Sequence, residues 1–222
     1  MAPKRRSYQA SATPITVFAH LLFIAVTILV LVWLIKFREG LSFTSDNKLK
    51  LFNLHPMFMI IGFVLISGQA IMAYKTIPAT RTRQKIVHMI LNLIALLAGI
   101  VGLYAVFQFH HDLGIPDVYT LHSWFGITTI SLFTLQWLFA FFTFWFPATY
   151  SARRVNFYPW HVLVGMVIFF MAILSAVTGL TEKFTFIGLK REQEALIVNF
   201  TGLLVFLFGV SVGFTVLLPT SY

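Results

Sequence analysis

Long apolar stretches alternate with short polar ones along the whole chain. Each apolar stretch has close to the roughly 20 residues that an α-helix needs to cross a hydrocarbon core about 30 Å thick. A helix also satisfies its own backbone hydrogen bonds, which an apolar environment requires. The pattern predicts an all-α membrane protein with six transmembrane helices, at about Ile15–Ile35, Leu54–Tyr74, Ile86–Phe107, Leu121–Phe146, Tyr158–Leu180 and Ala195–Leu218.

Composition supports a membrane protein. Of the 222 residues, 59% are hydrophobic and 10% are charged, and the mean hydropathy is +0.86. These values lie far from those of an ordinary soluble domain. Because no long polar stretch is left for a second domain, we expect one transmembrane domain over residues 1–222. A short cytoplasmic tail, at about residues 1–14, would precede an uncleaved first helix.

The chain contains no cysteine. This excludes disulfides, thiolate metal sites, iron–sulfur clusters and the covalent attachment of c-type haem. Any haem would therefore be held without a covalent link.

Basic residues are distributed unevenly between the two predicted faces. If the N-terminus is cytoplasmic, as the positive-inside rule indicates, the opposite face holds seven basic and seven acidic residues. The whole net charge of +9 then lies on the cytoplasmic face. Such a face also attracts anionic substrates. Its basic residues are Lys4, Arg5, Arg6, Lys75, Arg81, Arg83, Lys85, Arg153 and Arg154.

Four histidines lie near the beginnings of four consecutive predicted helices, at His55, His88, His122 and His161. Successive helices run in opposite directions, so His55 and His122 are expected near the non-cytoplasmic surface, and the other two near the cytoplasmic one. Ionisable residues at membrane depth are costly and usually functional. Haem iron accepts two axial imidazoles, which facing helices of a bundle can supply. The pattern predicts a four-helix core, formed by the second to fifth helices, holding two haems.

Small residues on the histidine faces agree with haem sites. Gly126 and Gly165 lie one turn beyond His122 and His161, and Gly62 lies two turns beyond His55. Glycines at these positions would leave room for the macrocycle, although simple helix packing would also explain each of them.

Three further histidines have no such partner. We expect His20 to be structural. His110 and His111 lie in the short segment HHDLGIPD, where a solvated position is the default and a substrate or metal role stays open.

Several motifs resemble those of the cytochrome b561 family, the ascorbate-dependent trans-membrane di-haem oxidoreductases. The resemblance extends from about Phe37 to Phe214 and is closer to plant-type endomembrane members. Its most specific motifs are Phe52-Asn53-Leu54-His55-Pro56, Ala73-Tyr74-Lys75, Lys85-Ile86-Val87-His88, the segment from Tyr119 to Gly126, Pro159-Trp160-His161 and the segment from Glu194 to Asn199.

The resemblance implies a homodimer of six-helix subunits, each with two non-covalent b haems. One haem would be ligated by His55 and His122 and the other by His88 and His161. Cytosolic ascorbate would be bound by Arg81, Lys85 and Arg154, and the opposite acceptor site would contain His110, Tyr119, Ser123 and Trp124.

The expected function is electron transfer from cytosolic ascorbate, through two haems, to monodehydroascorbate or a ferric chelate on the other side. Lys85 would attract the ascorbate anion and favour its loss of a proton. An endomembrane location, vacuolar or vesicular, is favoured, with the plasma membrane as the alternative. The rival hypothesis is a histidine-lined transporter of protons or divalent metal ions without haem. It needs the histidines to converge on one pathway, which two separate layers do not favour.

Overall fold

A computed structural model describes residues 11–145 and 152–219, with side chains in the second range from Arg154 onward. All regular structure within these ranges is helical. The α-helices are α1 (Ala12–Val32), α2 (Lys48–Phe52), α3 (Leu54–Pro56), α4 (Ile66–Thr76), α5 (Arg81–Leu113), α6 (Leu121–Ala140), α7 (Ala152–Phe186) and α8 (Gln193–Leu217). The π-helical segments η1 (Trp33–Phe37), η2 (Met57–Leu65) and η3 (Phe141–Trp145) continue α1, α3 and α6.

These elements join into six helical spans long and apolar enough to cross a membrane. The predicted fold is therefore confirmed for the described residues. The third and fifth spans reach 33 residues each, beyond the apolar runs that predicted them, because polar residues stay helical in the headgroup region. Most of the expected tail, residues 1–10, lies outside the described part of the chain. The spans are Ala12–Phe37, Lys48–Thr76, Arg81–Leu113, Leu121–Trp145, Arg154–Phe186 and Gln193–Leu217.

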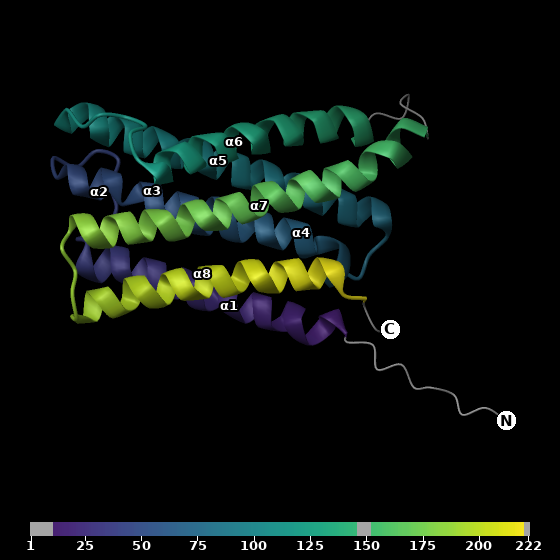
Figure 1. Ribbon diagram of the computed structural model, residues 1–222, viewed down its shortest axis with the longest axis horizontal. Helices are drawn as coiled ribbons and strands as arrows, with labels where there is room; N and C mark the ends of the chain where they lie inside the picture. Colours follow the sequence, from purple (N-terminus) through teal and green to yellow (C-terminus); the bar gives the residue numbers. More distant parts are fainter. Residues whose placement is uncertain (1–10, 146–151, 220–222) are drawn as a thin grey trace.

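The spans run roughly along one common axis, and successive spans point in opposite directions (Figure 1). α1 lies along α8 at one side of the bundle, α6 lies along α7, and α5 lies along the second span. The beginning of α1 and the end of α8 meet, where the Ala12 amide donates to the Pro219 carbonyl at 2.9 Å. First and last spans therefore form one side of the molecule.

The packed apolar core lies mainly among α1, α8 and the second span. Val26 and Val30 of α1 and Phe208 of α8 are fully buried in it. α4 approaches α8 so closely that a β-carbon on Gly68 would come 2.5 Å from the Phe208 ring. Small residues permit such close approach between membrane helices. The second span therefore packs into this core and also borders the space among the four histidine-bearing spans.

The second span is irregular just after its histidine. Pro56 follows His55 directly, and proline has no amide hydrogen to donate to the preceding turn. The nine residues Met57–Leu65 then form the π-helical segment η2 before α4 resumes regular geometry. A π-helical turn takes in more residues than an α-helical turn, so it rotates the side chains that follow. Positions after His55 therefore depart from α-helical spacing.

Polar contacts hold the segment between the first two spans. The Glu194 carboxylate of α8 forms an ion pair with Arg38 and accepts a hydrogen bond from the Trp33 indole nitrogen at 2.8 Å. The Asn53 side chain, only 2% exposed, donates to the carbonyls of Arg38 at 2.7 Å and Gly40 at 2.8 Å. One buried amide thus fixes the connection against the beginning of α3.

The Asn53 amide gives a test of this connection. In an Asn53→Asp variant a carboxylate would face the two carbonyls in place of a donor, which costs about 2 kcal/mol of unfolding free energy. We expect a clearly lower melting temperature for the purified protein in detergent. Asn156, exposed near the beginning of α7, is the matched control, and Asn156→Asp should melt like the wild type. Equal melting of both variants would contradict the assigned role.

Candidate functional site

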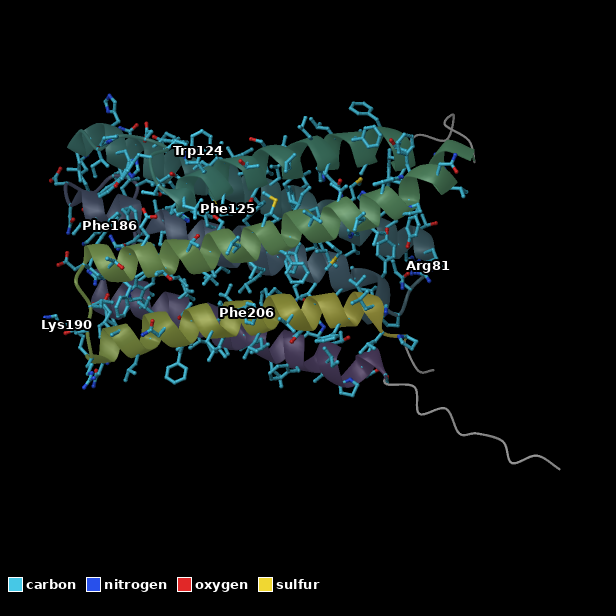
Figure 2. All side chains as sticks on the ribbon, viewed as in Figure 1. Arg81, Trp124, Phe125, Phe186, Lys190 and Phe206 are labelled. Carbon is cyan, nitrogen blue, oxygen red and sulfur yellow. The ribbon has the colours of Figure 1, made fainter. Side chains whose placement is uncertain are left out.

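Two cavities lie among the second to fifth spans, one toward each end of the bundle. The inner cavity, of about 650 Å³, contains His88 and His161 and extends to Arg81, which lies at one end of the bundle. The outer cavity, of about 590 Å³, contains His55 and His122 and lies toward the opposite end (Figure 2). These names follow the orientation predicted from charge. Both volumes lie in the range of roughly 300–1,000 Å³ that is typical of cofactor sites.

The cavities approach each other at mid-depth. Ala172 of α7 lines both of them and is itself buried. The aromatic rings of Phe63, on the outer side, and Phe133, on the inner side, pack edge to face with centroids 4.8 Å apart. Among the described residues, the first span and α8 contribute only at the margins, through Trp33 of η1 and the end of α8.

The histidines meet in pairs. The ring centroids of His55 and His122 are 6.1 Å apart, with ring planes at 85°. Those of His88 and His161 are 6.2 Å apart, with planes at 76°. Two imidazoles bound to one metal ion from opposite sides, at about 2 Å each, have centroids roughly 6 Å apart. The pairs are those expected from helix order, and their spacing suits two axial ligands of one iron.

Neighbouring helices hold three of these rings in place. Each of the three Nδ1 atoms is within hydrogen-bond distance of a backbone carbonyl, which fixes it as the protonated nitrogen. The Nε2 atom is then the unprotonated one that can bind a metal, and an outer hydrogen bond of this kind is usual for a metal-binding histidine. The contacts are His55 to Gly102 at 3.0 Å, His88 to Ala70 at 2.8 Å and His122 to Ser175 at 2.9 Å.

Glycines provide part of the space around the rings. Gly126 lines the outer cavity and Gly165 the inner one, as expected. Gly179 of α7 is more restrictive, because a β-carbon there would come 2.6 Å from Cε1 of His122. Gly62 differs from its expected role. The π-helical segment turns it toward Ala98 of α5, where a β-carbon would be 2.5 Å from the alanine methyl, so it serves helix packing.

The donor set fits haem better than a bare divalent cation. Among the described residues there is no group of three or more histidine, cysteine or acidic side chains that could enclose a metal ion. Each cavity offers instead two opposed imidazoles, largely apolar walls and a volume far larger than one ion needs. Two axial nitrogens and a wide apolar space are what a bis-histidine haem requires.

Basic side chains gather at the mouth of the inner cavity. Arg81, Lys85 and Arg154 all line it, as the predicted ascorbate site requires. Lys85 donates to the Phe144 carbonyl and lies over the Trp145 ring, 5.5 Å from its centroid. Arg154 donates from Nε to the Thr143 carbonyl at 3.2 Å. Because these carbonyls belong to η3, the end of the fourth span positions two of the three cations.

The outer mouth is built from the end of α5, the connection to α6 and the beginning of α6. His110 lies within α5 and not in a loop, Tyr119 lies in the connection, and Ser123 lies in the first turn of α6. His110, Tyr119 and Ser123 line the outer cavity, which brings together three of the four predicted acceptor-site residues. His110 Nδ1 is 2.8 Å from the Asp117 carboxylate. The Thr120 and Ser123 side chains form a capping box that begins α6 one residue before His122. Capping thus fixes the position of the histidine and the serine together.

Trp124, the fourth predicted residue, is placed elsewhere. Its side chain is 62% exposed and does not line the outer cavity. Figure 2 shows it at the edge of α6, next to Phe125. The structure therefore offers no contact between Trp124 and a molecule bound beside His122. His20 lies outside both cavities, in keeping with a structural position.

Some site residues were not predicted from sequence. Asp117 was counted only as a charge, although the acidic end of HHDLGIPD is a signal for a histidine partner. Asn92, one turn after His88, places its amide nitrogen 3.3 Å from Nε2 of that histidine. Lys183 and Phe52 line the outer cavity side by side. No spacing rule in the sequence connects these two residues, since they lie on different spans.

Comparison with known proteins gives consistent matches. A family model described as eukaryotic cytochrome b561 matches residues 54–187. The probable ascorbate-specific transmembrane electron transporter 2 of Oryza sativa subsp. japonica is 46% identical over 206 residues, covering 90% of this chain and 87% of that protein. Transmembrane ascorbate ferrireductase 1 of Arabidopsis thaliana is 41% identical over 209 residues, covering 92% and 87%. The transmembrane ascorbate-dependent reductase CYB561 of Sus scrofa is 38% identical over 218 residues, covering 95% and 85%.

The family match covers more than half of the chain and all four paired histidines. The relatives align over almost its full length, and the rice protein is more similar than the pig protein, in agreement with the plant-type prediction. Membrane spans, histidine pairs and sequence similarity lead to the same assignment: the chain belongs to the cytochrome b561 family of haem b proteins.

Proposed function

We propose that this protein transfers electrons across a membrane, from ascorbate at the inner mouth to an acceptor at the outer mouth. The observation that carries the proposal is the presence of two histidine pairs, each spaced for one iron, in two cavities toward opposite ends of the bundle. Relatives named as ascorbate-specific electron transporters and ascorbate ferrireductases support the donor.

The proposed cofactors are two non-covalent haem b groups per chain. His88 and His161 would hold one, and His55 and His122 the other. Haem iron alternates between ferric and ferrous states and so supplies one-electron chemistry. The chain supplies ligand orientation through the carbonyls bonded to Nδ1, together with an apolar surrounding that keeps water away from the path.

At the inner mouth the three cations would bind and orient the ascorbate monoanion. Arg81 and Arg154 offer several fixed N–H donors, whereas Lys85 offers a compact charge. As the ascorbate monoanion gives up an electron it also gives up a proton, which water at the mouth would take up, and it becomes monodehydroascorbate. The Lys85 ammonium favours that proton loss by stabilising the negative charge left on the substrate oxygen. Lys85 is the proposed catalytic residue on this side.

At the outer mouth the acceptor would be monodehydroascorbate or a ferric chelate. His110 Nδ1 lies against the Asp117 carboxylate, so that Nε2 is the ring nitrogen available to an acceptor. Tyr119 lines the same cavity and carries a hydroxyl group. Both groups can form hydrogen bonds with the oxygens of either acceptor.

We further propose a cytoplasmic N-terminus, an endomembrane location and a homodimer. The charge asymmetry between the two mouths supports the orientation, since basic residues concentrate on cytoplasmic faces. The location and the dimer rest on family resemblance. Light scattering of the protein–detergent complex, corrected for bound detergent, should give a protein mass of two chains.

The rival function, a histidine-lined transporter for protons or divalent metal ions, fits the geometry less well. Its histidines would have to converge on one pathway, but they form separate pairs in separate cavities. A visible absorption spectrum before and after ascorbate addition separates the two functions. Sharp bands of reduced haem b are expected, and a colourless protein would exclude the cytochrome.

Removal of one histidine should remove one haem. We expect His88→Ala to retain the outer haem, to bind about half of the wild-type haem and to lose reduction by ascorbate, because an imidazole at one axial position is lost. Haem content per chain is measured by the pyridine haemochrome method. His20→Ala is the matched control and should keep both haems. Full haem content in His88→Ala would refute its role as a ligand.

Removal of the Lys85 charge should weaken ascorbate binding. For Lys85→Met we expect about tenfold more ascorbate at half-reduction, since charge-assisted hydrogen bonds contribute roughly 1.5–3 kcal/mol. The measurement is an ascorbate titration followed at the absorption band of reduced haem. Arg83→Met is the control, because Arg83 is exposed and outside the inner cavity. An unchanged titration for Lys85→Met would argue against the inner ascorbate site.

Filling the space beside His122 should displace its ring. A side chain at Gly179 would overlap the imidazole, so Gly179→Val should lose the outer haem and retain the inner one. Gly202→Val is the comparison, because a β-carbon at Gly202 meets only Leu180 at 3.7 Å. Haem content and the two-step redox titration report the outcome. Two intact haems in Gly179→Val would show that His122 does not need this space.

A further inference from the structure

Lys183 lies near the outer end of α7 and lines the outer cavity. Its Nζ atom is 3.9 Å from the centroid of the Phe52 ring. Phe52 in turn packs at a tilt against the His55 ring, with centroids 6.1 Å apart. The ammonium group is therefore separated by one aromatic ring from the outer histidine pair. The site described above assigns no task to this cation.

The charge of Lys183 is not paired. Within residues 11–145 and 154–219, its ammonium has no hydrogen bond and no ion pair, and its contact is with the face of Phe52. The nearby charges are Arg38 and Glu194. The Glu194 carboxylate is already engaged by Arg38 and by the Trp33 indole. One positive charge is left over in this cluster.

Other carboxylates do not remove this excess. Glu182 also lines the outer cavity, but it forms no ion pair with Lys183. Asp117 is engaged by His110, and Asp112 by Lys48 at 2.8 Å. At the inner mouth, by contrast, the Lys85 ammonium has a backbone carbonyl as acceptor. Lys183 is thus a half-buried cation at the wall of the outer cavity. Among the described side chains and carbonyls, no hydrogen-bond acceptor pairs with its ammonium group.

An ammonium group has three N–H donors and is strongly hydrated, so its partial burial needs compensation. A ring face attracts a cation only weakly and does not satisfy its N–H donors. A negatively charged oxygen would satisfy charge and donors together, through a short charge-assisted hydrogen bond. Because Lys183 lines the outer cavity beside the histidine pair, an oxygen bound to its ammonium would belong to a molecule that occupies this cavity.

We propose that Lys183 is an anion-binding residue of the outer cavity, and that its Nζ atom binds a carboxylate or enolate oxygen there. Two sources share this chemistry: a propionate of the haem held by His55 and His122, and an anionic electron acceptor at the mouth. This proposal rests on the function proposed above. It adds a binding residue on the fifth span to an outer site otherwise built from the end of α5, the connection to α6 and the beginning of α6.

The test compares Lys183→Met, which keeps the stem over Phe52 without the charge, with Lys183→Arg, which keeps the charge. Lys190→Met is the matched control, because Lys190 is exposed at the same end, outside the cavity (Figure 2). For each protein, haem content and the midpoint potentials of both haems are measured after dithionite reduction. KM is then measured with ferric citrate, an anionic acceptor, and with hexaammineruthenium(III), a cationic one.

If the propionate is the partner, Lys183→Met loses the outer haem or lowers its midpoint potential, because loss of a positive charge disfavours the reduced state. Where the outer haem is retained, the KM values stay unchanged. If the acceptor is the partner, KM for ferric citrate rises about tenfold at unchanged potentials, and KM for the cationic acceptor does not rise. Lys183→Arg should restore wild-type behaviour in either case. Both results support the proposal.

Wild-type values of haem content, potential and KM in Lys183→Met would overturn the proposal. If this variant does not fold, Lys183→Gln replaces it, and wild-type values in Lys183→Gln would overturn the proposal equally. Failure of the proposed function is distinguishable. It would appear as a wild-type protein that ascorbate does not reduce, whereas the haem and potential measurements on Lys183 use dithionite and do not depend on ascorbate.

Discussion

The structure depends on the need to satisfy imidazole nitrogens inside a membrane. An unpaired polar group in hydrocarbon is costly, and each of these partly buried histidines has two ring nitrogens to satisfy. Nδ1 of His55, His88 and His122 donates a hydrogen bond to a backbone carbonyl of a neighbouring helix. Nε2 of each ring is then the unprotonated nitrogen that can bind a metal. The same contact fixes ring orientation, ring tautomer and helix spacing. Binding chemistry and helix packing therefore have one common cause.

These hydrogen bonds and the histidine pairs connect different helices. The carbonyl contacts join the second span to α5, twice, and α6 to α7. The histidine pairs join the second span to α6, and α5 to α7. The carbonyl contacts therefore define two halves, the second span with α5 and α6 with α7. A group held by both histidines of a pair would link one half to the other. Assembly of the four-helix unit and loading of its cavities are, in this arrangement, parts of one process.

The features that could be predicted from the sequence are those that depend on the length of the apolar runs, their order along the chain and the direction of successive helices. Six apolar runs correspond to six spans, and alternating direction correctly indicated the two histidine pairs. The sequence did not predict what depends on helical rotation. Gly62 was assigned to the His55 face from α-helical spacing, but the π-helical segment after Pro56 turns it toward Ala98. Trp124 follows the serine of the outer cavity by one residue, which is enough to place it on the outside of α6.

Partners contributed by other spans could not be predicted either. The carbonyl of Ser175, the space at Gly179 and the ring of Phe52 beside Lys183 become relevant only when helices far apart in sequence are placed together. Residue type indicates that a histidine needs a partner, but not which backbone atom provides it. The role of the outer-cavity lysine depends on tertiary placement for the same reason.

Ala172 lines both cavities, and its position separates the two mouths from the part of the bundle where the cavities meet. Ala172 is shared by the two cavities and is a different residue from those at either mouth that would meet soluble molecules. Substitutions at one mouth can therefore alter which donor or acceptor reacts there without lengthening the internal gap. Reaction partners and internal transfer distance are structurally independent, so related chains can diverge in the first while keeping the second.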